Sequence, residues 1–242
     1  MANRNFVNSR LSKGFSWRDI PMVWWALAVL LGALALQAQS RPDVVSVNLQ
    51  NVSPLQGVLR FAVENRIPLG VVLSPQAGLC DSTKTVTLKN VPIGRVFDGL
   101  LAGSDYGWFV EDGVFVVRPR TLPASSANML GLKFEQFTGM KTTIQGLGII
   151  LAGYIHGKLR PDEGYAGDIL ASNNAESVGP LDLRDVTVKQ IANQIVSLDG
   201  KGAWILYPVP EDPARAIDAR RLYVYGYSDD SRVLTELSCA NP

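Results

Sequence analysis

Four side chains near the middle of the chain could take part in acid–base chemistry. His156 is the single histidine of the sequence, and Asp162, Glu163 and Asp168 follow it closely. Two carboxylates about 5 to 9.5 Å apart can hydrolyse a glycosidic bond, and only the fold decides such a separation. A hydrolase that uses these four residues is therefore the alternative function.

The spacing of these residues does not match a known kind of site. A calcium loop needs oxygen ligands at alternating positions around a central glycine, and residues 162–168 do not supply them. A lone histidine without a neighbouring Cys or His is a weak zinc ligand. Gly146 and Gly148 resemble a dinucleotide fingerprint only superficially, because no strand precedes them. We expect a protein without enzymatic activity, cofactor or metal.

The charge balance argues against nucleic-acid binding. The 242 residues include 23 Lys and Arg and 22 Asp and Glu, so the formal net charge is +1. Such a chain carries no basic field that would attract nucleic acid. Its length suffices for two small domains behind a targeting segment.

Residues 1–38 have the pattern of a secretory signal peptide. Basic residues precede an apolar run over residues 22–36, and Ala38 offers a small residue for cleavage. An uncleaved anchor with its basic end in the cytoplasm is the other interpretation. Either way, we expect the remaining chain to be exported, in the periplasm or a similar compartment, and to contact the membrane only through this segment.

The two cysteines of the chain, Cys80 and Cys239, both lie in the exported part. An oxidising compartment permits a disulfide between them. An unpaired thiol near the end of the chain is the alternative for Cys239. The pair is thus a possible disulfide.

Residues 84–120 form the clearest structural unit. Val86 and Leu88 alternate with polar residues, which predicts a half-buried strand. Apolar residues at helical spacing follow from Ile93, and Gly103 ends the predicted helix. Asp112-Gly113 then favours a tight turn between two strands. The unit is therefore expected to be strand, helix, hairpin.

The same pattern occurs in two further places. Residues 46–75 repeat the strand, the helix and a buried strand, and residues 181–227 repeat the whole unit with a longer hairpin loop. Asn51, Asn90 and Asp185 occupy the same position in the three copies. A strand near residues 133–137 and a helix near 140–158 could be a diverged version of the first copy, which would make the protein two divergent domains of similar plan.

These patterns predict an α+β fold of two small domains. The first covers residues 39–120, residues 121–131 are a Pro/Ser/Ala linker, and the second covers residues 132–242 as a possible divergent copy. Each domain is expected to pack a short sheet against two helices. Tyr223, Tyr225 and Tyr227 alternate on one predicted strand, where they form either core packing or an aromatic contact face.

Residues 44–120 resemble the short N-terminal module of secretins and TonB-dependent receptors. The run Leu100-Leu101-Ala102-Gly103-Ser104 is similar to the end of that family's helix, and residues 114–119 are similar to its closing strand. The resemblance implies a small βαβ-type module outside the cytoplasmic membrane that makes protein contacts. Nothing after Pro180 resembles a secretin ring or a β-barrel, so an accessory role in a secretion, transport or signalling system is expected.

An open sheet edge in such a module can accept a strand from another protein. We therefore expect an envelope protein as the partner, bound by pairing at a sheet edge.

Overall fold

The computed structural model describes most of the chain beyond the expected signal segment. The described residues from Val44 onward belong to one compact unit. None of the described helices is long and apolar enough to cross a membrane. Residues 1–38, with the predicted signal or anchor, lie outside the described part, which comprises residues 44–74, 79–80, 82–164, 176–198, 200–208 and 222–227.

The first copy of the repeat folds as its sequence predicts. Strand β1 (Val44–Val52) leads into helix α2 (Pro54–Glu64), and the buried strand β2 (Leu69–Val72) follows. Ser53 caps α2 in a capping box with Gln56, which satisfies backbone N–H groups at the helix start.

The second copy contains the predicted hairpin. Strand β3 (Lys84–Pro92) continues directly into helix α3 (Ile93–Leu101). Strands β4 (Tyr106–Glu111) and β5 (Val114–Pro119) then pair in antiparallel fashion. The turn residues Asp112 and Gly113 have φ angles of 52° and 77°, the left-handed conformation that a two-residue hairpin turn requires.

The predicted linker contains a helix. Helix α4 (Ala124–Leu130) buries Ser126, Met129 and Leu130, so residues 121–131 are not a linker throughout. Strand β6 (Lys133–Gly139) and helix α5 (Ile144–Leu159) follow. The glycines of α5 permit close packing, because a Cβ at Gly148 would lie 2.6 Å from the Cβ of Val224.

The last copy supplies strand β7 (Leu181–Thr187), helix α6 (Val188–Ser197), strand β8 (Gly202–Leu206) and strand β9 (Leu222–Gly226). Strands β8 and β9 form the expected antiparallel pair.

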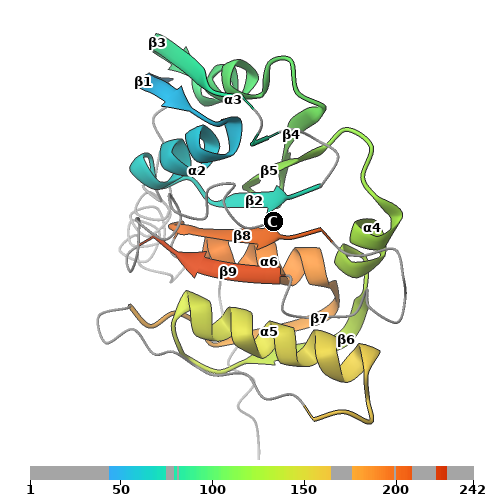
Figure 1. Cartoon of the computed structure of the whole chain (residues 1–242). Helices are drawn as coiled ribbons and strands as arrows, with labels where there is room; N and C mark the ends of the chain where they lie inside the picture. Colours follow the sequence, from blue (N-terminus) through green and yellow to red (C-terminus); the bar gives the residue numbers. More distant parts are fainter. Residues whose placement is uncertain are drawn as a thin grey trace, which may run out of the picture. The chain divides into compact units, whose positions relative to one another are not determined.

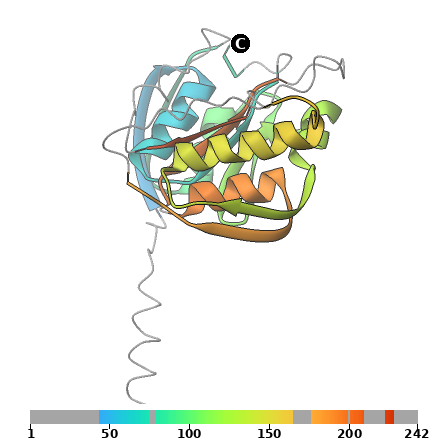
Figure 2. The same ribbon diagram turned by 90° about the horizontal axis from the view of Figure 1, so that it is seen from below.

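The elements stack in five layers (Figure 1). The central layer is a five-stranded sheet of order β4-β5-β2-β8-β9. Helices α2 and α3 separate it from the two-stranded sheet β1-β3, and helices α5 and α6 separate it from the two-stranded sheet β6-β7. Figure 2, a view from below, shows α5 and α6 side by side on one face of the central sheet.

The central sheet joins the two halves of the chain. Strand β2 pairs in parallel with β5 of its own half and with β8 of the other half. Leu69 and Val71 point into the core with α2 and α3, whereas Val72 lies in the core with α5 and α6. The predicted α+β class is confirmed, and the two expected domains share one sheet.

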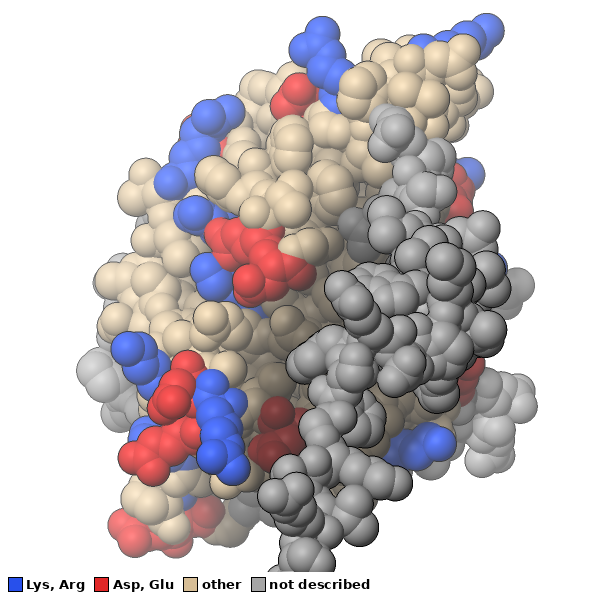
Figure 3. Space-filling view, turned by 180° about the vertical axis from the view of Figure 1, so that it is seen from behind, with Lys and Arg blue, Asp and Glu red and all other residues tan. Residues whose placement is uncertain are grey.

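The charged side chains do not gather by sign on the face seen in Figure 3, where basic and acidic groups are interspersed. This distribution agrees with the formal net charge of +1.

Candidate functional site

Strand β4 is an open edge of the central sheet. It pairs with β5 on one side, and no strand of the described residues pairs with its other side. An open edge presents backbone N–H and C=O groups to a further strand. The β4 edge, defined as Tyr106–Glu111, is therefore the first candidate for function.

The hairpin register shows which backbone groups face outward. In a two-residue hairpin the residues that flank the turn, here Glu111 and Val114, exchange hydrogen bonds, and bonded and non-bonded pairs then alternate. The Phe115 N–H accordingly donates away from β4, to the carbonyl of Pro68 at 3.0 Å. The N–H and C=O groups of Trp108 and Val110 thus point outward from the sheet.

Two apolar side chains of β4 are solvent-exposed. Phe109 is 38% exposed and Val110 is 57% exposed, and they lie on opposite faces of the strand. The guanidinium of Arg118 lies 4.2 Å from the centre of the Phe109 ring, a cation–π distance. A partner strand would meet an apolar side chain on each face of the edge.

A groove of about 400 Å³ follows the edge on the side of α3. Trp108 forms part of its wall and is held in place, because its Nε1 donates to Asp98 Oδ1 at 2.9 Å and its ring stacks on Phe97 and Phe115. The lining comprises Asp98, Leu101, Ala102, Gly103, Tyr106, Gly107, Trp108, Phe109 and Arg120.

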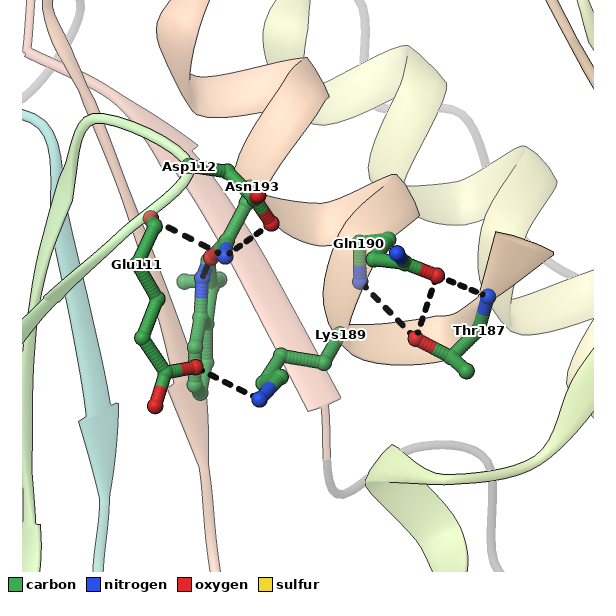
Figure 4. A network of polar contacts seen from close by, with 7 residues as sticks. Glu111, Asp112, Thr187, Lys189, Gln190 and Asn193 are labelled. Carbon is green, nitrogen blue, oxygen red and sulfur yellow. Dashed lines mark hydrogen bonds and ion pairs between the residues drawn. The ribbon is translucent and has the colours of Figure 1, made fainter.

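A buried amide fastens the β4-β5 turn to the second half of the chain (Figure 4). Asn193 of α6 is fully buried. Its Nδ2 donates to the Glu111 carbonyl at 3.4 Å and to Asp112 Oδ2 at 3.3 Å, and its Oδ1 accepts from Trp204 Nε1 at 2.8 Å. The amide thus holds α6, β8 and the turn together.

An ion pair supports the same junction. Lys189 Nζ lies 2.5 Å from Glu111 Oε2, with both side chains partly buried. Next to it, Thr187 caps α6 in a capping box with Gln190 (Figure 4). Contacts at the turn therefore fix the position of the β4-β5 hairpin, which carries the β4 edge, against α6.

The tyrosine cluster consists of Tyr207, Tyr223 and Tyr225, whereas the sequence placed Tyr223, Tyr225 and Tyr227 on one face. The rings of Tyr223 and Tyr225 lie parallel at 6.0 Å, and Tyr207 of the neighbouring strand meets Tyr223 edge-on at 5.4 Å. Tyr227 is buried and its hydroxyl donates to the Ile67 carbonyl at 2.7 Å, so it belongs to the core. Its position just beyond β9 brings its ring under the loop that follows α2.

Burial raises the pKa of the Tyr225 hydroxyl far above its usual value, and the nearby Tyr207 and Tyr223 raise it further. Burial also raises the pKa of Tyr207, with a smaller contribution from Tyr223. The Tyr207 and Tyr225 phenols are therefore neutral at physiological pH.

Cys80 is disulfide-bonded. The other cysteine of the chain, Cys239, lies outside the described residues, so the pairing of the two stays a prediction.

The residues of the alternative hydrolase site are spread over the end of α5 and the residues after it. His156 belongs to the last turn of α5. Glu163 forms an ion pair with Arg160 at 2.8 Å, Asp162 is exposed, and Asp168 lies outside the described residues. In the described part of the chain, no three His, Cys, Asp or Glu residues are placed to hold a metal ion.

The sequence interpretation missed Asn193, Lys189 and Arg118. All three are polar residues inside amphipathic segments, where the apolar pattern assigns them to solvent. The sequence did contain one relevant signal, the Asp112-Gly113 turn. A tight turn fixes where the hairpin strands end, and polar residues that hold such a turn can be sought around it.

Comparison with protein-family models, with curated proteins and with solved structures finds no match to this chain. The resemblance of residues 44–120 to the N-terminal module of secretins and TonB-dependent receptors stays a prediction.

Proposed function

We propose that this chain is an exported protein-interaction module that binds an extended segment of an envelope protein along the β4 edge. The observation that carries the proposal is the outward-facing backbone of Trp108 and Val110 beside the groove of about 400 Å³. An added strand gains main-chain hydrogen bonds at such an edge, and pockets for alternate side chains provide selectivity.

Two further features support this function. The disulfide at Cys80 fits an oxidising compartment outside the cytoplasm, as does the apolar segment at residues 22–36. The β4 edge also lies within residues 44–120, the part that resembles a protein-contacting module. The accessory role in a secretion, transport or signalling system belongs to the same proposal.

The geometry specifies the kind of segment that fits. It is extended, and it places an apolar side chain into the groove beside Trp108, where Leu101 and Ala102 provide apolar contacts. Its next side chain lies on the opposite face, near Phe109. Exposed Val110 adds apolar area at the turn end of the edge.

The test replaces Val110 by proline. Val110→Pro removes one outward N–H and leaves the pairing of β4 with β5, because proline is tolerated on edge strands. A photo-crosslinker at position 110 first identifies the partner segment in whole cells. We then expect affinity for a peptide of that segment to fall about tenfold or more, since one lost hydrogen bond and a restricted edge cost about 1.4 kcal/mol.

Val44→Pro is the matched control, because Val44 is an exposed first residue of another strand. This variant should bind the peptide as the unchanged protein does. Protection of the Trp108 and Val110 amides from hydrogen exchange in the complex is the second expected result. Equal binding by both variants, or protection confined to other strands, would contradict the proposal.

A further inference from the structure

A second hollow lies on the opposite face of the β4-β5 hairpin. It has a volume of about 530 Å³ and is bounded by the hairpin, α4 and the start of α6. We call it the hairpin pocket. Its lining comprises Glu111, Asp112, Val116, Arg118, Leu122, Ala127, Leu130, Gly131, Thr187, Lys189 and Gln190.

Part of the hairpin pocket is apolar. Val116 and Leu130 are 1% and 5% exposed, so they form a firm surface that belongs to the core, and Leu122 packs against the same core. Small-molecule sites combine such a surface with a few polar groups and have volumes of about 300 to 1,000 Å³. The pocket therefore suits a ligand with an apolar body.

Three of the four charged side chains that line the pocket have a charged or hydrogen-bonding partner in the described part of the chain, and Arg118 is the exception. Glu111 and Lys189 neutralise each other, and Asp112 accepts a hydrogen bond from Asn193. Arg118 has no carboxylate within ion-pair distance among the described residues, and its guanidinium lies over the ring of Phe109. Arg118 thus retains its donors for a ligand.

Arg118 also lies far from the acidic end of the pocket. Its backbone is five residues along β5 from Gly113, roughly 16 Å at a rise of about 3.3 Å per residue, and its guanidinium lies over Phe109, three residues or about 10 Å along β4 from Asp112. At that separation solvent and salt screen the interaction between the two side chains. The Arg118 end of the pocket is accordingly cationic.

We propose that the hairpin pocket binds a carboxylate that carries an apolar body. The planar guanidinium of Arg118 offers parallel N–H donors that match the two oxygens of a carboxylate. Stacking on Phe109 limits the freedom of the guanidinium, so less entropy is lost when the carboxylate binds. The apolar body of the ligand lies against Val116, Leu122 and Leu130. The hairpin pocket shares no lining residue with the groove of the β4 edge, and the two sites meet only at Phe109, which lines the groove and stacks on Arg118.

The test compares a carboxylate with its uncharged amide on the full chain. N-acetyl-L-leucine and N-acetyl-L-leucinamide are titrated while the methyl signals of Val116, Leu122 and Leu130 are followed by NMR. We expect the acid to shift these signals saturably and to bind at least tenfold more tightly than the amide. Arg118→Gln should remove this difference.

Arg120→Gln is the control, because Arg120 lines the groove of the β4 edge instead. It should keep the preference for the acid, and thermal unfolding of both variants checks that they are folded. No binding of the acid, equal binding of acid and amide, or an unchanged preference in Arg118→Gln would overturn the proposal. Once binding is established, a tripeptide that ends in a free leucine carboxylate shows whether the natural ligand is a peptide C-terminus or a small free acid. Tighter binding than N-acetyl-L-leucine indicates a peptide C-terminus. Weaker binding indicates a small free acid.

Discussion

Asn193 shows how a single buried amide can connect distant parts of this chain. It joins the turn of one hairpin to Trp204 on β8, whose indole in turn covers Gly70 on β2. A Cβ at position 70 would lie 2.3 Å from that indole, so only glycine fits there. Because a buried polar group is costly unless its hydrogen bonds are made, the three partners stabilise one arrangement of the two halves.

We predict that Asn193→Leu lowers the free energy of unfolding by about 2 to 3 kcal/mol, because it leaves the Trp204 N–H buried without an acceptor. Leucine keeps the branching and the number of side-chain heavy atoms of asparagine but is bulkier, so the effect combines the lost hydrogen bonds with a packing cost at this buried position. Urea unfolding measures the change. Asn48→Leu at an exposed strand position is the matched control and should change stability by less than about 0.5 kcal/mol. A loss equal to that of the control would contradict the assigned role.

At the scale of elements, the three strand-to-helix junctions share one backbone conformation. Asn51, Asn90 and Asp185 each have a φ angle of 51°, although they lie far apart in the sequence. In the β1-β3 pair the register shifts next to Asn51 and next to Asn90. The Asn90 N–H donates to Ser46 Oγ at 3.1 Å, and the Asn51 N–H donates to Thr85 Oγ1 at 3.5 Å. Strands β1 and β3 therefore each contain one bulge just before the following helix begins.

The chemistry of this position yields a prediction for Asn90. Asn90→Val should lower the free energy of unfolding by about 1 to 2 kcal/mol, because a β-branched residue strongly disfavours the left-handed conformation. Asn90→Gly should be neutral to within about 0.5 kcal/mol, since glycine adopts this conformation freely. Chemical denaturation measures both changes.

Thr87→Val on the same strand is the control, since valine suits an extended strand position. A loss of stability in Thr87→Val as large as that in Asn90→Val would show that strand packing, and not the φ angle, causes the effect.

At the scale of the whole described unit, the central sheet makes the two halves depend on each other. Val72, Val114 and Val116 belong to strands of the first half, yet they are at most 1% exposed because they pack on the helices of the second half. Burying a valine side chain is worth about 1.5 to 3 kcal/mol. The first half alone would therefore lose an amount comparable to the net stability of a small domain, about 5 to 15 kcal/mol.

We predict that a fragment of residues 44–120 does not unfold cooperatively by itself. Circular dichroism during urea unfolding should show a broad transition, and the fragment should bind the dye ANS through the exposed valines. The intact chain is the reference and should unfold in a single sharp transition. A sharp transition of the fragment at the same urea concentration would mean that two independent domains are present after all.

Local patterns predicted most elements of this protein, with helix α4 in the expected linker as an exception. Alternating and helical spacing of apolar residues, with prolines and glycines at the boundaries, predicted the hairpin at Asp112-Gly113 and the buried faces of α2, α3 and α6, because these patterns record how a short segment orients its side chains. The tertiary structure alone decided that β2 lies between β5 and β8, that Asn193 is buried, and that β4 is left as an open edge. Such pairings depend on contacts between residues far apart in the chain, and no period within a segment encodes which distant strand becomes its neighbour.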